Sequence, residues 1–169
     1  MKSHRLVGGN AGDPSHMSDS GAYQMILRLE RPAVIAVGAL GSHEFLAGFY
    51  VYTGRASKGL SKRIARHRRP EKKLRWHIDY LLQQARINGV QLYHGKAAEE
   101  CAINNETAQA LHGVFPVKGF GSSDCRCASH LTLVPEKNIT KLKAMIGQLH
   151  IDDALQEATT ELKKPAQCT

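Results

Sequence analysis

Short apolar segments separated by turn-forming residues make up the first part of the hydrophobic pattern. The segments are "GAYQMILRLE" from Gly21, "AVIAVGAL" after Pro32, and "FYVYTG" ending at Gly54. Their length and their aromatic and β-branched content predict three strands, with a turn over residues 41–48 between the second and the third. Several short strands close together predict an antiparallel sheet at the start of the folded domain.

From Gly54 onward the apolar residues recur at helical spacing. Leu60 and Ile64 are four apart and share one helical face, and Pro70 ends the helix that they predict. A second helix is predicted within "KLRWHIDYLLQQAR", with an exit turn at Asn88-Gly89. A third helix is predicted over residues 96–112.

The remaining pattern predicts two more strands and a last helix. The strands are "VQLYH", and "LTLV" after the loop "GFGSSDCRCASH". A C-terminal helix is predicted by the spacing of Ile139, Leu142, Ile146 and Leu149, continued by "DDALQEATTELKK". The fold class is therefore α/β in the α+β sense: a small central antiparallel sheet flanked by helices, with a C-terminal helical extension.

Composition divides the chain into three parts. Residues 1–18 are Gly-rich and aperiodic and predict a flexible leader, whose Ser15-His16-Met17 junction is also what a cloning scar looks like. Residues 19–135 form the folded domain, and residues 136–169 the helical extension. No apolar run approaches the roughly 20 residues of a membrane helix, and no signal pattern is visible. We therefore expect a cytoplasmic protein without a membrane partner.

The positive charge is concentrated in one window. The chain has 23 Lys and Arg against 15 Asp and Glu, and residues 55–75 hold ten of the basic residues with a single acid, Glu71. The window carries +9, and the rest of the chain, with 13 basic and 14 acidic residues, carries −1. A surplus confined in this way indicates a patch that neutralises phosphates, and a solvated basic helix is the alternative.

One pair of tyrosines lies just before this window, and a pair of polar side chains lies within it. Tyr50 and Tyr52 are two apart and share a strand face, whereas Arg63 and His67 are four apart and share a helical face. Two phenols beside a cationic helix could activate or position a nucleophile, although strand tyrosines that simply pack give the same pattern.

Three short motifs in this region resemble the signature of the GIY-YIG nuclease superfamily. They are Gly21-Ala22-Tyr23, Tyr52-Thr53-Gly54, and Arg63-Ile64 with His67 three residues on. The stretches "WHIDYLL", "EEC" and "GFGSSDCRCASHL" resemble the Uri-like branch, and the likeness spans roughly residues 20–135. The chain departs from the family in Ala22 and in a longer interval between the two tripeptides. We place the extra residues in "RPAVIAVGALGSHEFLAG", and Tyr50 is the substitute if Tyr23 is not the counterpart.

The resemblance implies a metal-dependent endonuclease that hydrolyses phosphodiester bonds in nucleic acid, with DNA as the favoured substrate and RNA as the alternative. The two tripeptides would lie on neighbouring strands, with Arg63 on the following helix. The implied catalytic residues are Tyr23, Tyr52, Arg63, His67 and Glu100. Glu100 would hold one Mg²⁺ or Mn²⁺ ion, with Glu99 as the fallback.

Each implied residue has a chemical task. Tyr23 or Tyr52 would take a proton from water, and Arg63 would offer phosphate oxygens a planar fork of donors. His67 would contact phosphate or relay a proton, and Tyr50 and His77 are possible supports. The nucleic acid would be gripped by the basic residues Arg55, Lys58, Lys62, Arg66, Arg68 and Arg69.

Two questions stay open from the sequence: whether the domain is catalytic, and what the cysteines do. The long interval between the tripeptides is also compatible with a catalytically inactive nucleic-acid-binding module of the same fold. Four residues, Cys101, Cys125, Cys127 and His130, could supply the ligands of a structural zinc ion, although paired zinc cysteines usually have a two-residue gap. Buried thiols without metal, or a zinc-stabilised scaffold for a protein partner, are the other interpretations. The oligomeric state stays open.

Overall fold

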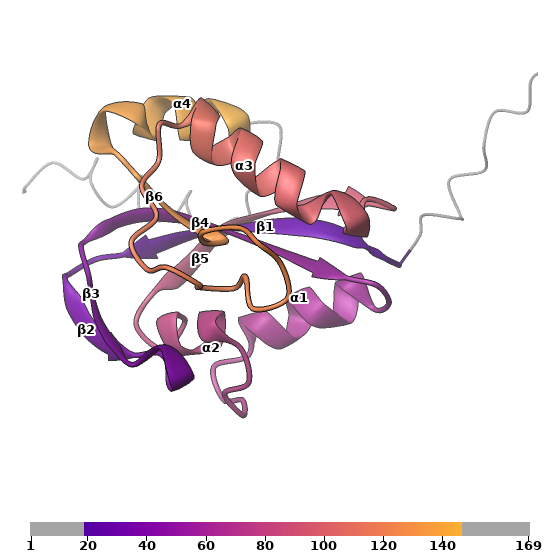
Figure 1. The fold of residues 1–169 in the computed structure, drawn as a ribbon, viewed down its shortest axis with the longest axis horizontal. Coiled ribbons are helices and arrows are strands. Elements are labelled where there is room, and N and C mark those ends of the chain that lie inside the picture. The colour runs from indigo at the N-terminus through magenta and orange to yellow at the C-terminus, as the bar shows by residue number, and fades with distance from the viewer. Residues whose placement is uncertain (1–18, 147–169) are drawn as a thin grey trace, which may run out of the picture.

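A four-stranded antiparallel sheet lies between two layers of helices in the computed structural model, which describes residues 19–146 (Figure 1). Its strand order is β5-β1-β4-β6, with the bounds β1 Gly21–Leu29, β4 Gly48–Ala56, β5 Arg86–His94 and β6 Leu131–Val134. The expected leader (residues 1–18) and the expected end of the C-terminal helix (residues 147–169) lie outside the described residues. The fold class predicted from the sequence is confirmed.

The helices divide between the two faces of the sheet. On one face lie α1 (Leu60–Arg68) and α2 (His77–Leu81), and on the other lie α3 (Glu100–Ala110) and α4 (Ile139–Ile146), as Figure 1 shows. The central strand β1 is buried on both faces, which explains its nearly continuous apolar run. Its alternate residues enter two cores. Tyr23, Met25 and Leu27 belong to the core that includes Leu60, Ile64, Ile78 and Leu81, and Ile26 packs with Val51, Leu111, Val134 and Leu142.

The residues that lengthen the interval between Tyr23 and Tyr52 form a separate hairpin. Strands β2 (Ala33–Ala36) and β3 (Ser42–Phe45) pair with each other and not with the main sheet. Strands β1 and β4 therefore pair directly, with Tyr23 opposite Gly54 and Met25 opposite Tyr52. The predicted placement of the extra residues is confirmed, but the predicted turn over residues 41–48 is wrong, because its middle is strand β3.

Two other element predictions are also wrong in part. The helix predicted within residues 73–86 is only the five-residue α2. The predicted exit turn at Asn88-Gly89 lies inside β5, where the pairing with β1 shifts so that Ile26 faces Gly89 and Leu27 faces Ile87. Asn88 is thus the extra residue of a bulge, because a bulge accommodates turn-forming residues without ending the strand.

The third predicted helix begins later than expected, and the start of the extension packs on the sheet. A short 3-10 turn, Ala97–Glu99, precedes α3, which begins at Glu100. In α4, Leu142 is 3% exposed and packs with Val134 of β6. Within residues 19–146, no helix has the length and apolar character needed to cross a membrane.

Candidate functional site

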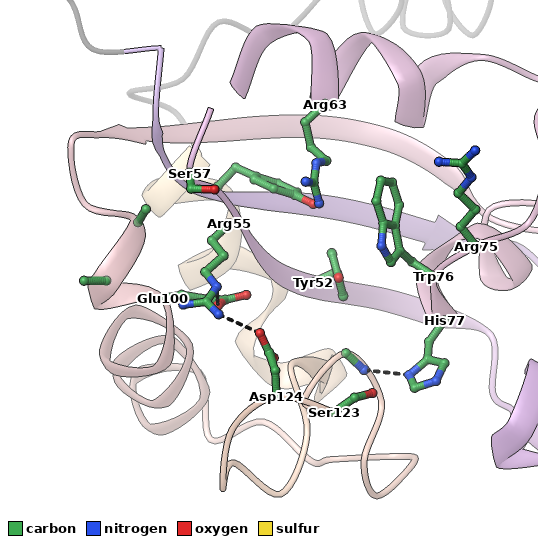
Figure 2. A pocket seen from close by; sticks show the side chains of 14 residues that line it. Tyr52, Arg55, Ser57, Arg63, Arg75, Trp76, His77, Glu100, Ser123 and Asp124 are labelled. Carbon is green, nitrogen blue, oxygen red and sulfur yellow. Dashed lines mark hydrogen bonds and ion pairs between the residues drawn. The ribbon is translucent and has the colours of Figure 1, made fainter. Parts of the chain in front are cut away.

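A cleft of about 710 Å³ opens at the end of the sheet where β1 begins and β4 ends. Residues of β1, β4, α1, α3, the segment before α2 and the loop after Phe120 line it (Figure 2). Four of the five implied catalytic residues line this cleft: Tyr23, Tyr52, Arg63 and Glu100. Segments far apart in the sequence thus meet at one place, as a catalytic site requires.

Tyr23 is held in the cleft wall by the strand opposite. A Cβ added to Gly54 would lie 2.5 Å from the Tyr23 ring and hydroxyl, so only glycine leaves room for the phenol at this position. The Tyr23 hydroxyl lies 2.8 Å from His67 Nε2. Burial raises the pKa of Tyr23 above its ordinary value, and the Arg63 guanidinium opposes this rise. The phenol is therefore protonated near neutral pH.

His67 lies behind Tyr23, outside the cleft wall. Its side chain is fully buried, and Nδ1 faces Asp79 Oδ1 at 3.8 Å. Burial lowers the pKa of His67 to about 4, with Asp79 acting in the opposite direction, so the ring is neutral at pH 7. A proton on Nδ1, facing the carboxylate, leaves Nε2 to accept the hydrogen bond from Tyr23. Tyr23, His67 and Asp79 thus form a chain from the cleft into the core.

Asp79 is the buried anchor of α1 and α2, and sequence reasoning missed it. Arg66 donates to both of its oxygens, at 2.9 and 2.8 Å, and the backbone N–H groups of Arg75 and Trp76 donate to Oδ2 at 2.9 and 3.1 Å. Burial alone would raise the pKa of Asp79, but these donors hold it below its ordinary value. Arg66, expected to grip nucleic acid, is instead committed to this internal ion pair.

Arg63 reaches the cleft over an aromatic platform. Its guanidinium carbon lies 4.4 Å from the centre of the Trp76 ring, and that of Arg66 lies 4.1 Å from the same ring. Figure 2 shows Arg63 pointing from α1 into the cleft beside Trp76. A guanidinium stacked on a ring keeps its outward N–H groups free to bind an anion. Trp76 and Arg75 also line the cleft and were not identified from the sequence.

Glu100 enters the cleft from the first turn of α3. The helix is fixed to the sheet by the hydrogen bond from Gln24 Nε2 to Thr107 Oγ1, at 2.8 Å. The Glu100 side chain is 10% exposed, with Oε2 3.2 Å from Arg55 Nε and Oε1 3.3 Å from His130 Nδ1. The fallback Glu99 is exposed and pairs with Lys96. Of the two glutamates, Glu100 is therefore the one that faces the cleft.

Arg55 joins the two acidic residues of the cleft. It contacts Glu100 through Nε and donates from Nη2 to Asp124 Oδ2 at 2.6 Å, so it lies between the two carboxylates in Figure 2. The hydrogen bond from Arg55 lowers the pKa of Asp124. The Arg55 side chain is 49% exposed. A partly exposed arginine at the cleft mouth can exchange a carboxylate for a phosphate.

The remaining tyrosines and His77 have different surroundings. Tyr52 packs edge-on against Phe120, and burial raises its pKa well above the ordinary value. Tyr50, the expected substitute and support, does not line the cleft, and its hydroxyl donates to the carbonyl of Leu46 at 2.6 Å. His77 Nδ1 accepts a hydrogen bond from the Gly121 N–H at 3.0 Å and thereby fixes the loop that closes the cleft.

Most of the expected nucleic-acid contacts are exposed. Lys58, Lys62, Arg68 and Arg69 lie on the surface of α1 and its flanks. Lys72, a further basic residue of the window, donates to the carbonyls of His67 and Arg69 and caps the end of the helix. The basic surface beside the cleft thus consists of α1 and its two ends.

A second cluster lies next to Glu100. One potential ligand atom from each of Cys101, Cys125, Cys127 and His130 lies within 4.8 Å of the others. His130 Nε2 is 3.7 Å from Cys101 Sγ and 3.5 Å from Cys125 Sγ. This Cys₃His group could hold a metal ion such as zinc.

The comparison with known families gives one result. Residues 22–156 match the model of the family described as domain of unknown function DUF123, and the chain belongs to this family. No curated protein and no solved structure matches the chain. The match extends past residue 135 and therefore includes α4 with the domain.

Proposed function

We propose that this member of the family is a metal-dependent endonuclease of the GIY-YIG type, similar to the Uri-like branch, and that it hydrolyses phosphodiester bonds in DNA. One observation carries the proposal: Tyr23, Tyr52, Arg63 and Glu100 line a single cleft beside the basic helix α1. Hydrolysis of a phosphodiester needs a proton acceptor for water, cationic charge for the pentacovalent transition state, and stabilisation of the leaving oxygen. The cleft offers a residue for each task.

Arg63 binds the scissile phosphate in this proposal. The Trp76 ring holds its guanidinium 4.4 Å away and limits its orientations, which supports a preorganised phosphate site. Negative charge grows on the phosphate oxygens in the transition state, and a bidentate guanidinium matches two of them. Exposed Lys62 and Arg69 on α1 would bind neighbouring phosphates of the backbone.

Tyr23 accepts the proton of the attacking water as it passes its own proton to His67. The 2.8 Å contact between the Tyr23 hydroxyl and His67 Nε2 supports this order, since a neutral phenol cannot act as a base by itself. His67 is neutral at pH 7, so Nε2 has a lone pair for this proton; because burial lowers the pKa of His67 to about 4, the imidazolium forms only transiently, and Asp79 at 3.8 Å stabilises it. Tyr52, with its ring centre 6.3 Å from that of Tyr23, would orient the water or the phosphate.

Glu100 is the residue that would hold Mg²⁺ or Mn²⁺. A single carboxylate fits Mg²⁺, which keeps several waters, and the cleft of about 710 Å³ has room for them. Glu100 Oε2 faces Arg55, whose half-exposed side chain is able to turn to a substrate phosphate. A bound divalent ion would supply charge for the developing oxyanions.

The proposal is tested by incubating the protein with labelled single- and double-stranded DNA and RNA, in Mg²⁺, Mn²⁺ or EDTA. We expect DNA cleavage that EDTA abolishes. Removing one transition-state donor typically costs about 10²–10³ in rate, so the cleavage rate of Arg63→Ala should be lower than that of wild type by this factor. Glu100→Gln should lose cleavage, whereas its matched control Glu99→Gln should keep it. Cleavage undiminished in both Arg63→Ala and Glu100→Gln would refute the assignment.

A second candidate is a nucleic-acid-binding module without turnover. It is favoured by the two basic partners of Glu100, Arg55 and His130, and by the raised pKa of both cleft tyrosines. This candidate predicts salt-sensitive binding of oligonucleotides in the same assay with no product in either metal. Metal-dependent nicking that a single cleft substitution abolishes would exclude it.

A further inference from the structure

The cluster of Cys101, Cys125, Cys127 and His130 has the dimensions of a tetrahedral site. Zinc–sulfur bonds of about 2.3 Å and zinc–nitrogen bonds of about 2.0–2.1 Å place tetrahedral ligand atoms roughly 3.6–3.8 Å apart. His130 Nε2 lies 3.7 Å from Cys101 Sγ and 3.5 Å from Cys125 Sγ, and all four ligand atoms lie within 4.8 Å of one another. Thiolate and imidazole ligands favour zinc over Mg²⁺ or Ca²⁺. Four protein ligands leave no open position, as in structural zinc sites.

The loop that carries three of these ligands is preorganised by bonds that do not involve the cluster. The Gly119 N–H donates to the Ala128 carbonyl and the His130 N–H to the Phe120 carbonyl, both at 2.7 Å. Asn104 of α3 donates to the carbonyl of Ser129 at 2.9 Å, which ties the loop to the helix that carries Cys101. The one-residue gap between Cys125 and Cys127 is therefore compatible with a shared ion, because both ends of the loop are already fixed.

The His130 ring connects the cluster to the cleft. Its Nε2 faces the sulfur atoms, while its Nδ1 is buried, makes no hydrogen bond, and lies 3.3 Å from Glu100 Oε1. A histidine that binds metal through one nitrogen characteristically donates its other N–H to a carboxylate, which fixes the ring. Glu100 stands where that carboxylate is needed.

We propose that Cys101, Cys125, Cys127 and His130 bind one Zn²⁺ ion, and that the His130 ring links this ion to Glu100. On zinc binding the Nδ1 proton would engage Oε1 of Glu100, which lies 3.3 Å away, so that Oε2 remains directed toward Arg55 and the cleft. The zinc ion is thereby a positioning element for the cleft carboxylate. The positioning of Glu100 for cleavage rests on the proposed function, but zinc binding and its dependence on Glu100 do not.

The first experiment measures the metal content of the full chain purified from zinc-supplemented cells. We expect about one zinc per chain by elemental analysis, and the absorption bands of tetrahedral thiolate-bound cobalt after exchange with Co²⁺. Cys125→Ser and Cys127→Ser should lose the metal, and Cys168→Ser, outside the described residues, should retain it. Wild-type protein without zinc, or with iron in its place, would overturn the proposal, and so would full zinc retention in Cys125→Ser.

The second experiment tests the link to Glu100 and does not depend on the folding of the cysteine variants. Loss of a carboxylate that supports a metal-bound histidine typically costs about 10–100-fold in metal affinity. Competition with a chromophoric chelator should therefore show that drop in Glu100→Gln and no change in Glu99→Gln, whose carboxylate pairs with Lys96 at the surface. Equal zinc affinities in the two variants would refute the link. Neither experiment uses nucleic acid, so zinc binding without any cleavage would reject only the proposed function.

Discussion

Replacing Asp79 by asparagine should destabilise the protein more than any other loss of a single charge in the described residues. The Asp79 side chain is 0% exposed and accepts four hydrogen bonds, two from Arg66 and two from backbone N–H groups. In asparagine an NH₂ group replaces one of the two carboxylate oxygens, so a hydrogen-bond donor would face the N–H donors that now bind that oxygen. Removing one partner of a buried ion pair costs about 3–5 kcal/mol. Since Arg66 is 19% exposed and retains some water, we expect about 3 kcal/mol.

The assay is urea unfolding of the full chain, with Asp124→Asn as the matched control. Asp124 also pairs with an arginine, but its side chain is 61% exposed, so its loss should cost no more than about 1 kcal/mol. In a chain of 169 residues, about 3 kcal/mol corresponds to a fall of roughly 6–12 °C in Tm. A value below about 1 kcal/mol for Asp79→Asn would refute the reasoning.

The pH dependence gives the same prediction a second readout. The pKa of Asp79 is lower in the folded protein than in the unfolded chain, where it is about 3.9. Its contribution to stability is therefore complete above about pH 5 and is lost as the pH falls through the folded pKa. The stability difference between wild type and Asp79→Asn should shrink over that acid range. A difference that stays constant down to about pH 2 would contradict the assignment of Arg66 and Asp79 as a charged pair.

Two further predictions concern the cleft wall and the basic surface. Gly54→Ala should cost about 1–3 kcal/mol in urea unfolding, because its Cβ would lie 2.5 Å from the Tyr23 ring; an unchanged unfolding midpoint would contradict this packing. For oligonucleotide binding, Lys62→Ala should reduce the slope of log K against log salt concentration by about 1. The control Lys118→Ala should leave the slope unchanged, because Lys118 is exposed but lies outside the basic window. Equal slopes in the two variants would show that the nucleic acid does not bind along the basic surface of α1.

The sheet and the basic helix could be predicted from the sequence because their signals are local. The short apolar, β-prone runs of β1 and β4 and the spacing of Leu60 and Ile64 each depend on a few neighbouring residues. Strand β3 was missed because its four residues, Ser42–Phe45, lie between Gly41 and Gly48 and carry too little pattern. Asn88-Gly89 was misread because a bulge uses the same residue types as a turn.

The candidate site was predicted in its parts but not in its connections. Tyr23, Tyr52, Arg63 and Glu100, identified from the motifs, line one cleft, since motif residues can be recognised without knowing their contacts. The Arg66–Asp79 pair joins residues on opposite sides of Pro70, and the Glu100–His130 contact spans a long loop. Such long-range pairings have no local signal. The burial that makes His67 neutral likewise follows only from the packed fold.

The most direct test of the account is the single-turnover rate of Mg²⁺-dependent DNA cleavage by Tyr23→Phe and Tyr50→Phe. Both variants lose one buried phenol hydroxyl, but only Tyr23 lies in the cleft wall, where its hydroxyl contacts His67 behind it. We predict that Tyr23→Phe is slower than wild type by about 10²–10⁴, the usual contribution of a general base, and that Tyr50→Phe stays within a few-fold of it. Equal rates in the two variants, or a wild-type protein that binds DNA and never cuts it, would contradict the account.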